Sequence, residues 1–169
     1  TIAKSKIPTI ALAHGFCIGG ATSLVSACDI RLATKDAKFS IGETKLGLVA
    51  DVGVIQRMPK IVSSGDMNEL ALTGRIFDGE HAEKIRFVSK AYENSDDLFE
   101  AGEKLANEIS SNSKRIVQAT KEALEKSSNL TVDQGLDYAK LWSTSFLVSE
   151  DLREGVMAFL EKRDPKFNE

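Results

Sequence analysis

The sequence predicts an α/β protein built in two parts. Over residues 1–95, short apolar runs are interrupted by glycine-containing segments, which is typical of strands that lead into short helices. Over residues 96–169, apolar residues recur at the three- and four-residue spacing of amphipathic helices. The chain has 169 residues, 42% of them hydrophobic, which is enough to bury a sizeable core. We therefore expect a core in residues 1–95 and a helical region in residues 96–169.

Strands and one short helix are expected in the first part of the core. Residues 7–13 form an apolar run that predicts a buried strand, with Pro8 at its start, where proline is tolerated. Residues 29–33 alternate polar and apolar side chains, which predicts a half-buried strand, and residues 37–39 continue this pattern. Residues 21–27 predict a short helix between these strands.

Helices and turns are expected in the rest of the core. Residues 54–58 predict a helical turn that the following proline stops. Asp66 begins a D-M-N-E segment that fits a capping box, so we expect a helix to start there and to end at Gly74. Residues 77–84 predict another short helix, and residues 87–88 predict a strand.

Clear helix starts are present in the second part. Thr131 opens a T-V-D-Q capping box, and Ser149 precedes two acidic residues that suit the first turn of a helix. The helix between them carries Trp142 and Phe146 on a broad apolar arc. This arc is as consistent with packing inside the chain as with an interface to another chain.

Composition argues against several functions. The formal net charge is −3 and the sequence pI is about 5.5, which disfavours broad nucleic-acid binding. Cys17 and Cys28 have neither a C-x-x-C partner nor a histidine cluster, so we expect reduced core cysteines and no metal site. No apolar run has the length of a membrane span, and no signal peptide is visible. We therefore expect no membrane partner and a cytoplasmic location, with an organelle matrix as the alternative.

A glycine pair, Gly19-Gly20, separates the first predicted strand from the helix over residues 21–27. A strand that turns into a helix at glycine brings free backbone N–H groups and the positive end of the helix dipole to one point. Such a point can bind an anion or stabilise a developing oxyanion. The alternative is a tight turn in which glycine only relieves crowding, and the glycines by themselves favour this alternative.

Two carboxylates follow in an apolar, glycine-containing segment. Glu43 comes directly after residues 39–42, and Asp51 comes directly after the uncharged residues 46–50. A carboxylate on an apolar loop is desolvated, which favours its neutral form, and two such groups in one pocket can divide into an acid and a base. The alternatives are that both are solvated loop residues, or that Asp51 caps the following helix.

Four segments together carry a resemblance to a known family. They are HGFCIGGATSLVSACDIRLAT, AKFSIGETKLGLVADVG, IQRMPKIV and, near the end of the chain, SEDLREGVMAFLEKRDPKF. In combination they resemble the crotonase superfamily, the enoyl-CoA hydratases and isomerases, over nearly the whole chain. The resemblance implies a crotonase-like core of β-β-α turns and a helical C-terminal oligomerisation region. Family members normally have an N-terminal part, with a second oxyanion N–H, that is missing before Thr1, so we expect a truncated chain, a proteolytic product or a genuinely short protein.

The family pattern maps onto single positions of this sequence. Gly20 matches the glycine whose N–H forms half of the oxyanion hole for the thioester carbonyl. Glu43 matches the glutamate that hydratases and isomerases share, and Asp51 matches the aspartate typical of dienoyl-CoA isomerases. Ser23 departs from the pattern, because hydratases have glutamate there and dienoyl-CoA isomerases commonly have aspartate. The resemblance therefore implies that Glu43, Asp51 and Gly20 are the catalytic residues.

Other matched positions are expected to bind the substrate. They are Ile18, Gly19 and Ser23 beside the glycine pair, and Phe159 and Lys162 near the C-terminus, where the family contacts coenzyme A, often that of a neighbouring subunit. A different explanation for Lys162 is a favourable positive charge at a helix end.

The resemblance implies acyl-CoA chemistry through a thioester enolate. Asp51 would take a proton from the carbon beside the thioester, and Glu43 would return one at the far end of a conjugated diene. This shifts a 3,5-dienoyl-CoA to a 2,4-dienoyl-CoA in fatty-acid β-oxidation. No metal or other cofactor is implied, and a homo-trimer or hexamer is expected. The alternatives are an enoyl-CoA hydratase, a Δ3-Δ2-enoyl-CoA isomerase, or a non-catalytic subunit with the crotonase fold.

Overall fold

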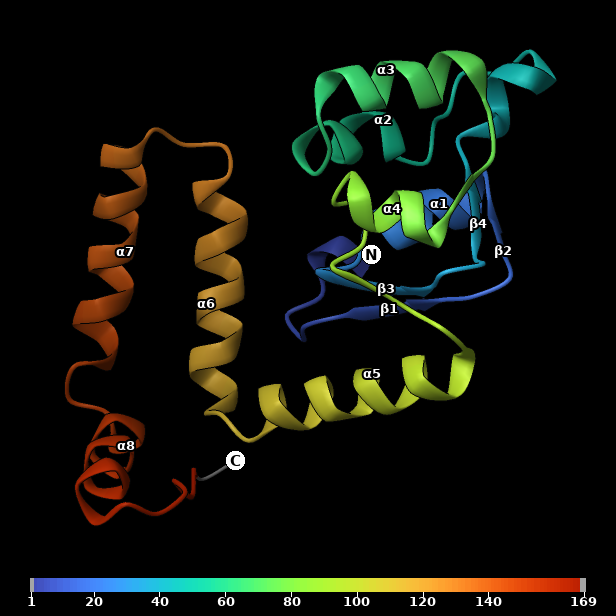
Figure 1. Cartoon of the computed structure of the whole chain (residues 1–169). Helices are drawn as coiled ribbons and strands as arrows, with labels where there is room; N and C mark the ends of the chain where they lie inside the picture. The colour runs from blue at the N-terminus through green and yellow to red at the C-terminus, as the bar shows by residue number, and fades with distance from the viewer. Residues whose placement is uncertain (1, 168–169) are drawn as a thin grey trace. The chain divides into compact units, whose positions relative to one another are not determined.

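The chain forms two compact units in a computed structural model that describes residues 2–167 (Figure 1). Unit 1 comprises residues 2–5 and Thr9–Lys104, and unit 2 comprises Lys6–Pro8 and residues 105–167. The ends of the two parts expected from the sequence, at residues 1, 168 and 169, lie outside the described residues. The functional division into residues 1–95 and 96–169 stays a prediction.

Unit 1 contains two three-stranded sheets. The first has parallel strands in the order β1-β3-β6, with Leu12 of β1 opposite Leu32 of β3. In the second, β2 and β4 are parallel and β5 is antiparallel to β4. The chain passes through β1, β2 and α1 and then through β3 and β4, so the expected β-β-α order is present. The strands are β1 Ile10–Ala13, β2 Phe16–Ile18, β3 Ile30–Thr34, β4 Lys38–Ser40, β5 Phe77–Asp78 and β6 Lys90–Tyr92.

Short helices connect these strands. Glycines in the left-handed conformation end two of them, Gly47 after η2 and Gly74 after α3, as is common at helix C-termini. The predicted helix end at Gly74 is therefore confirmed. The helices that begin in unit 1 are the 3-10 helices η1 Ile2–Lys4, η2 Gly42–Leu46 and η3 Met58–Lys60, together with α1 Gly20–Ser26, α2 Val54–Arg57, α3 Ser64–Thr73, α4 Gly79–Lys84 and α5 Ser95–Ser110.

Two predicted helix starts in unit 1 are wrong. The N-cap of α3 is Ser63, whose hydroxyl accepts the backbone N–H of Asp66 at 3.1 Å, so the helix begins before the predicted start at Asp66. Residues 77–84 divide into β5 and α4. The Asp78 side chain ends the strand and caps the helix by accepting the backbone N–H of the third helical residue at 2.9 Å.

The strand predicted at residues 87–88 is also wrong, because β6 begins at Lys90. Phe87 and Val88 are fully buried but lie in a bend. The Phe87 carbonyl accepts from Arg31 Nε at 2.7 Å, and the Val88 N–H donates into α4. The Phe87 carbonyl and the Val88 N–H are therefore already hydrogen-bonded outside any sheet. A strand was predicted because a buried bend and a buried strand both require apolar residues in the sequence.

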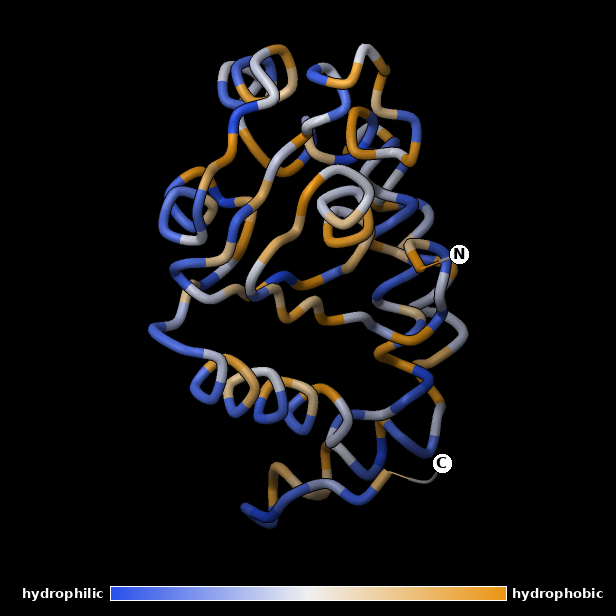
Figure 2. The backbone as a smooth tube through the Cα atoms, turned by 90° about the vertical axis from the view of Figure 1, so that its right-hand side faces the viewer, coloured by the Kyte–Doolittle hydropathy of each residue, from blue (hydrophilic) through white to orange (hydrophobic). Residues whose placement is uncertain are grey.

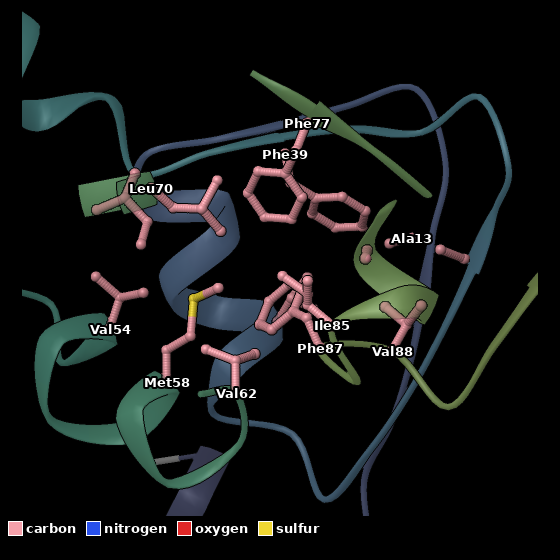
Figure 3. Close-up of a cluster of buried hydrophobic side chains, with 14 of the residues drawn as sticks. Ala13, Phe39, Val54, Met58, Val62, Leu70, Phe77, Ile85, Phe87 and Val88 are labelled. Carbon is pink, nitrogen blue, oxygen red and sulfur yellow. The ribbon is translucent and has the colours of Figure 1, made fainter. Parts of the chain in front are cut away.

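The core of unit 1 is built around a cluster of three phenylalanines (Figure 3). The ring centroids of Phe39 and Phe77 are 5.5 Å apart, and those of Phe39 and Phe87 are 5.4 Å apart. Met58 and Leu70 from the helical segments complete the same buried cluster. Phe39 belongs to β4, so this packing fixes the strand that leads to Glu43.

The first half of α5 packs on β1 within unit 1. Gly102 leaves no room for a side chain, since a Cβ there would lie 2.6 Å from both δ carbons of Leu12. Leu98 on the same helix is fully buried. Figure 2 shows hydrophobic and hydrophilic residues alternating around the turns of α5, as expected for a helix with one buried face.

Unit 2 is helical, with α6 and α7 packed side by side (Figure 1). The capping box at Thr131 is confirmed: its hydroxyl accepts the Gln134 N–H at 3.3 Å, and the Gln134 side chain accepts the Thr131 N–H at 3.1 Å. The cap at Ser149 is confirmed as well, by a 3.1 Å bond from the Leu152 N–H. The helices are α6 Lys114–Ser127, α7 Val132–Phe146 and α8 Glu150–Glu161.

Candidate active site

The turn between β2 and α1 has a backbone geometry that glycine adopts most readily. Gly19 has φ 57° and ψ −116°, and its N–H donates to the Ser40 carbonyl of β4 at 2.8 Å. α1 begins at Gly20, so the Gly20 N–H lies in the first turn and has no acceptor within the helix. Gly20 is exposed. Apart from its two chain neighbours and the nearby backbone of its own helix, no described atom lies within 4 Å of the position that a Cβ on Gly20 would take. A ligand oxygen therefore has room to approach this turn.

Glu43 lies directly against the glycine turn. It is in the first turn of η2, and a Cβ on Gly19 would be 3.3 Å from Glu43 Oε1. The other oxygen, Oε2, is buried and has no hydrogen-bond partner within residues 2–167. Ile18 lies at the same place, since a Cβ on Gly42 would be 3.7 Å from Ile18 Cγ2. The structure thus brings Ile18, the two glycines and Glu43 together.

Ser23 lies one helical turn beyond Gly19. Its N–H donates to the Gly19 carbonyl at 3.0 Å, so residues 19 and 23 share one face of α1. The Ser23 side chain is 1% exposed, and its hydroxyl has no hydrogen-bond partner in the described part of the chain. A buried polar group without a partner is rare and marks a position where a ligand can supply one.

Thr22 connects the glycine turn to the strand that leads to Glu43. It is fully buried, and its hydroxyl contacts the carbonyls of Cys17 on β2 and Ser40 on β4, the latter at 3.0 Å. The same hydroxyl accepts the Ser40 N–H at 3.3 Å. One side chain therefore joins β2, α1 and β4 within a few residues of Gly20 and Glu43.

Asp51 lies in an exposed stretch between two glycines in the left-handed conformation, Gly47 and Gly53. Gly53 is the N-cap of α2, and no side chain caps this helix, so the alternative that Asp51 is a cap is wrong. The prediction that both carboxylates are desolvated is wrong for Asp51 in this chain. Its neighbour Ala50 is buried, but Asp51 itself is exposed, and the nearby Val49 and Val52 are 80% and 59% exposed.

Phe159 and Lys162 belong to unit 2. Phe159 lies on α8 with 83% of its surface exposed, and Lys162 ends the helix with the positive φ of 54°. Arg163 follows and donates to both carboxylate oxygens of Glu154, at 2.6 and 3.0 Å. These bonds, with one from the Lys166 N–H at 2.6 Å, lower the pKa of Glu154 to about 2. The end of α8 is therefore held in a defined conformation.

The two cysteines, the possible metal ligands and the helices of the described chain indicate no further kind of site. Cys17 and Cys28 are half-buried. The Cys28 thiol donates to the Leu24 carbonyl at 3.7 Å, and burial raises the pKa of the Cys17 thiol. Within the described chain, no three or more His, Cys, Asp or Glu side chains are grouped so that they could hold a metal ion. None of the helices formed by residues 2–167 combines the length and apolar character needed to cross a membrane.

The family of the chain follows from its similarity to known proteins. The family model described as "Enoyl-CoA hydratase/isomerase" matches residues 1–169. The chain belongs to this family. Both the resemblance inferred from the motifs and the predicted α/β fold are thereby confirmed.

Several relatives within the enoyl-CoA hydratase/isomerase family carry a more specific name. The chain is 49% identical over 166 residues to the mitochondrial Delta(3,5)-Delta(2,4)-dienoyl-CoA isomerase of Dictyostelium discoideum, which covers 98% of this chain and 57% of the relative. It is 43% identical to the peroxisomal protein of the same name from Arabidopsis thaliana, covering 98% and 60%. The chain thus spans little more than half the length of the curated relatives it matches.

Solved structures of family members share the fold. An enoyl-CoA hydratase from Mycobacterium marinum is 33% identical, with a TM-score of 0.90 over 96% of this chain and 64% of that chain. An enoyl-CoA hydratase from Bacillus anthracis is 30% identical, with a TM-score of 0.91 over 98% and 64%.

Two residues near the candidate site, Thr22 and Arg57, were not predicted from the sequence. Thr22 is a single buried hydroxyl whose partners depend on the pairing of β2 with β4, and nothing in its local sequence marks it. Arg57 contacts the loop of Asp51, and its spacing of four residues from Gly53 at a helix start was an available signal.

Proposed function

We propose that the enzyme containing this chain is a dienoyl-CoA isomerase, which shifts a 3,5-dienoyl-CoA to a 2,4-dienoyl-CoA. The observation that carries the proposal is the contact between Glu43 and the Gly19-Gly20 turn. This contact places the Glu43 carboxylate, whose Oε2 has no hydrogen-bond partner among residues 2–167, beside the exposed first turn of α1. The names of the relatives from Dictyostelium discoideum and Arabidopsis thaliana support the choice of reaction.

In this mechanism the thioester carbonyl accepts a hydrogen bond from the Gly20 N–H. Negative charge develops on that oxygen when a proton leaves the neighbouring carbon, so the N–H lowers the barrier to proton removal. Asp51 takes this proton, and the electron pair spreads over the diene. Glu43, which begins the cycle as the acid, returns a proton at the far end of the diene. Each turnover leaves Asp51 protonated and Glu43 ionised, and proton exchange restores both.

The remaining candidate residues are proposed to hold the substrate. Ile18, Gly19 and Ser23 surround the glycine turn and would contact the acyl thioester. Phe159 and Lys162 would contact coenzyme A from the end of α8. No cofactor beyond the coenzyme A of the substrate is part of this proposal.

The exposure of apolar side chains on α7 and α8 supports an oligomer, with a trimer or hexamer as the expected state. Leu141 on α7, Leu147 at the end of α7 and Phe159 on α8 are each more than 60% exposed, and exposed apolar side chains gathered on a helical region mark interaction surfaces. The two relatives described above are named mitochondrial and peroxisomal, which favours an organelle matrix over the cytoplasm. Microscopy of the tagged whole protein would test the compartment.

The decisive experiment follows the absorbance of the conjugated diene in the whole enzyme that contains this chain. Asp51→Asn is expected to lower turnover by roughly 100- to 10000-fold, because a positioned base is lost. Glu43→Gln should be similarly severe, since an amide cannot return a proton. Ser23→Ala should change turnover far less, because serine is neither acid nor base at neutral pH. Wild-type turnover by Asp51→Asn would contradict the proposal.

A Δ3-Δ2-enoyl-CoA isomerase that uses Glu43 alone is the second candidate. It is favoured by one observation: Glu43 lies against the glycine turn, whereas Asp51 is exposed. This candidate would be correct if the wild-type enzyme isomerised a monoenoyl-CoA and did not isomerise a dienoyl-CoA. Hydration is disfavoured because Ser23 occupies the position of the second glutamate.

A further inference from the structure

The segment that carries Asp51 is held at its two ends. At its start, the Leu48 N–H donates to the backbone carbonyl of Glu43 at 3.0 Å. At its end, Arg57 Nη1 donates to the Val52 carbonyl at 3.1 Å. Residues 48–53 have neither helix nor strand. The position of Asp51 therefore depends on these attachments more than on regular secondary structure.

Arg57 comes from a well-anchored element. It is the last residue of α2, and its N–H donates to the Gly53 carbonyl at 3.1 Å. Val54 at the start of the helix and Met58 directly after it are fully buried in the core (Figure 3). The backbone of Arg57 is thus fixed to the core of unit 1, and the half-buried side chain reaches from there to the loop.

The guanidinium lies on Gly53, where a larger residue would displace it. A Cβ on Gly53 would stand 2.3 Å from Arg57 Nη1 and 2.8 Å from Cζ. Gly53 also has φ 100°, a conformation that other residues rarely adopt. A residue other than glycine would therefore be strained in its backbone, and its Cβ would move the flexible guanidinium away from the loop.

We propose that Arg57 is a positioning residue that orients Asp51 for proton removal. The Val52 carbonyl is separated from the Asp51 α-carbon by one peptide unit and one residue, so a bond to this carbonyl restricts the rotation of the backbone that directs the Asp51 side chain. The guanidinium, planar and always charged, keeps this bond over the whole working pH range. Arg57 acts through Asp51 and does not touch the substrate.

This inference rests on the proposed function, because it assumes that Asp51 is the base for the dienoyl substrate. It predicts a selective defect. Arg57→Gln should lower turnover of a dienoyl-CoA by about 100-fold, as a displacement of about 1 Å commonly does, with little change in KM. Isomerisation of a monoenoyl-CoA, where the wild type performs it through Glu43, should change less than about threefold.

The test combines Arg57→Gln and Asp51→Asn in a double-mutant cycle, measured in the whole enzyme. If Arg57 acts through Asp51, Arg57→Gln adds little to the defect of Asp51→Asn; independent, multiplicative defects would overturn the proposal. Arg57→Lys, which keeps a donor, should recover part of the turnover. Arg75→Gln is the matched control, since Arg75 pairs with Glu69 on α3 at 2.8 Å. It should leave turnover unchanged.

Backbone amide exchange separates failure of this inference from failure of the proposed function. Arg57→Gln should accelerate exchange in residues 48–53 and leave β1 and β3 unchanged, whatever the reaction is. Gly53→Ala, which displaces the guanidinium but keeps its charge, should do the same. Unchanged exchange in both variants would overturn the inference. Accelerated exchange together with wild-type turnover in Asp51→Asn would refute the proposed reaction, and with it the positioning role.

Discussion

Removal of the Thr22 hydroxyl should loosen the connection between the Gly19-Gly20 turn and the strand that leads to Glu43. Thr22→Val keeps the shape of the fully buried side chain and deletes only its polar contacts with Cys17 and Ser40. A net hydrogen bond contributes about 0.5–1.5 kcal/mol, and buried partners left unsatisfied raise the loss to about 1–3 kcal/mol. Thr22→Ser keeps the hydroxyl and removes one methyl group, which should cost about 1 kcal/mol.

Amide exchange of Gly19 measures this effect where it occurs, because its N–H donates to the Ser40 carbonyl that Thr22 also contacts. A loss of about 1–3 kcal/mol corresponds to exchange that is roughly 5- to 150-fold faster in Thr22→Val. Thr22→Ser should show an increase of about fivefold. Since the hydroxyl holds the turn in register with Glu43, turnover should fall in Thr22→Val and recover in Thr22→Ser. If the valine variant exchanged no faster than the serine variant, packing of the methyl group would be the dominant effect and the reasoning would be wrong.

Three further predictions concern other parts of the chain. Gly19→Ala should destabilise unit 1 by about 1–3 kcal/mol in urea unfolding, because alanine is strained at φ 57° and its Cβ would press on Glu43 Oε1 at 3.3 Å; turnover should fall with it, and a neutral outcome in both measurements would argue against the contact. The end of α8 should loosen in acid: the pKa of Glu154 is lowered to about 2 from 4.5, so its contribution is fully present above pH 4.5 and is lost as the pH falls towards 2. Exchange of the Lys166 N–H should follow this change, and Glu154→Gln should abolish the pH dependence. Light scattering of this chain should give about three or six times its mass of 18.4 kDa, and Leu141→Glu on α7 should reduce the measured mass; a monomer at high concentration would contradict the proposed assembly.

Helix caps were predictable wherever the decisive contact is local. Thr131 and Ser149 cap their helices through bonds to the backbone three residues ahead, so the sequence holds all the partners. The same rule misplaced the start of α3, because Ser63 and Asp66 both suit a cap and Asp66 in fact receives a hydrogen bond from the Ser63 hydroxyl at 2.7 Å. Local chemistry therefore indicates that a helix starts nearby, and the backbone decides which residue begins it.

The candidate site shows the same difference between features that depend on local sequence and features that depend on the folded chain. The match of Gly20, Glu43 and Asp51 to family positions predicted oxyanion and proton-transfer chemistry, whereas the glycines alone favoured a simple turn and the carboxylates alone left solvated loop residues open. The contact of Glu43 with Gly19 joins residues 24 positions apart, and it exists because β2 and β4 pair in parallel with Ile18 opposite Ser40. The exposure of Asp51 could not be predicted, since apolar neighbours in sequence cover a side chain only when the fold brings them over it.

The sequence by itself determined the family, the α/β class and the β-β-α order, and it supplied the candidate site residues, because these depend on composition, short spacings and motifs. Only the tertiary structure decided how those residues are held. The Thr22 hydroxyl reaches the Ser40 carbonyl 18 residues away because β2 pairs with β4, and Arg57 reaches the Val52 carbonyl because the loop folds back over the end of α2. A hydrogen bond requires atoms within about 3 Å and in line. Such geometry is a property of the packed chain, so side chains of ordinary type become positioning residues only once the fold has formed.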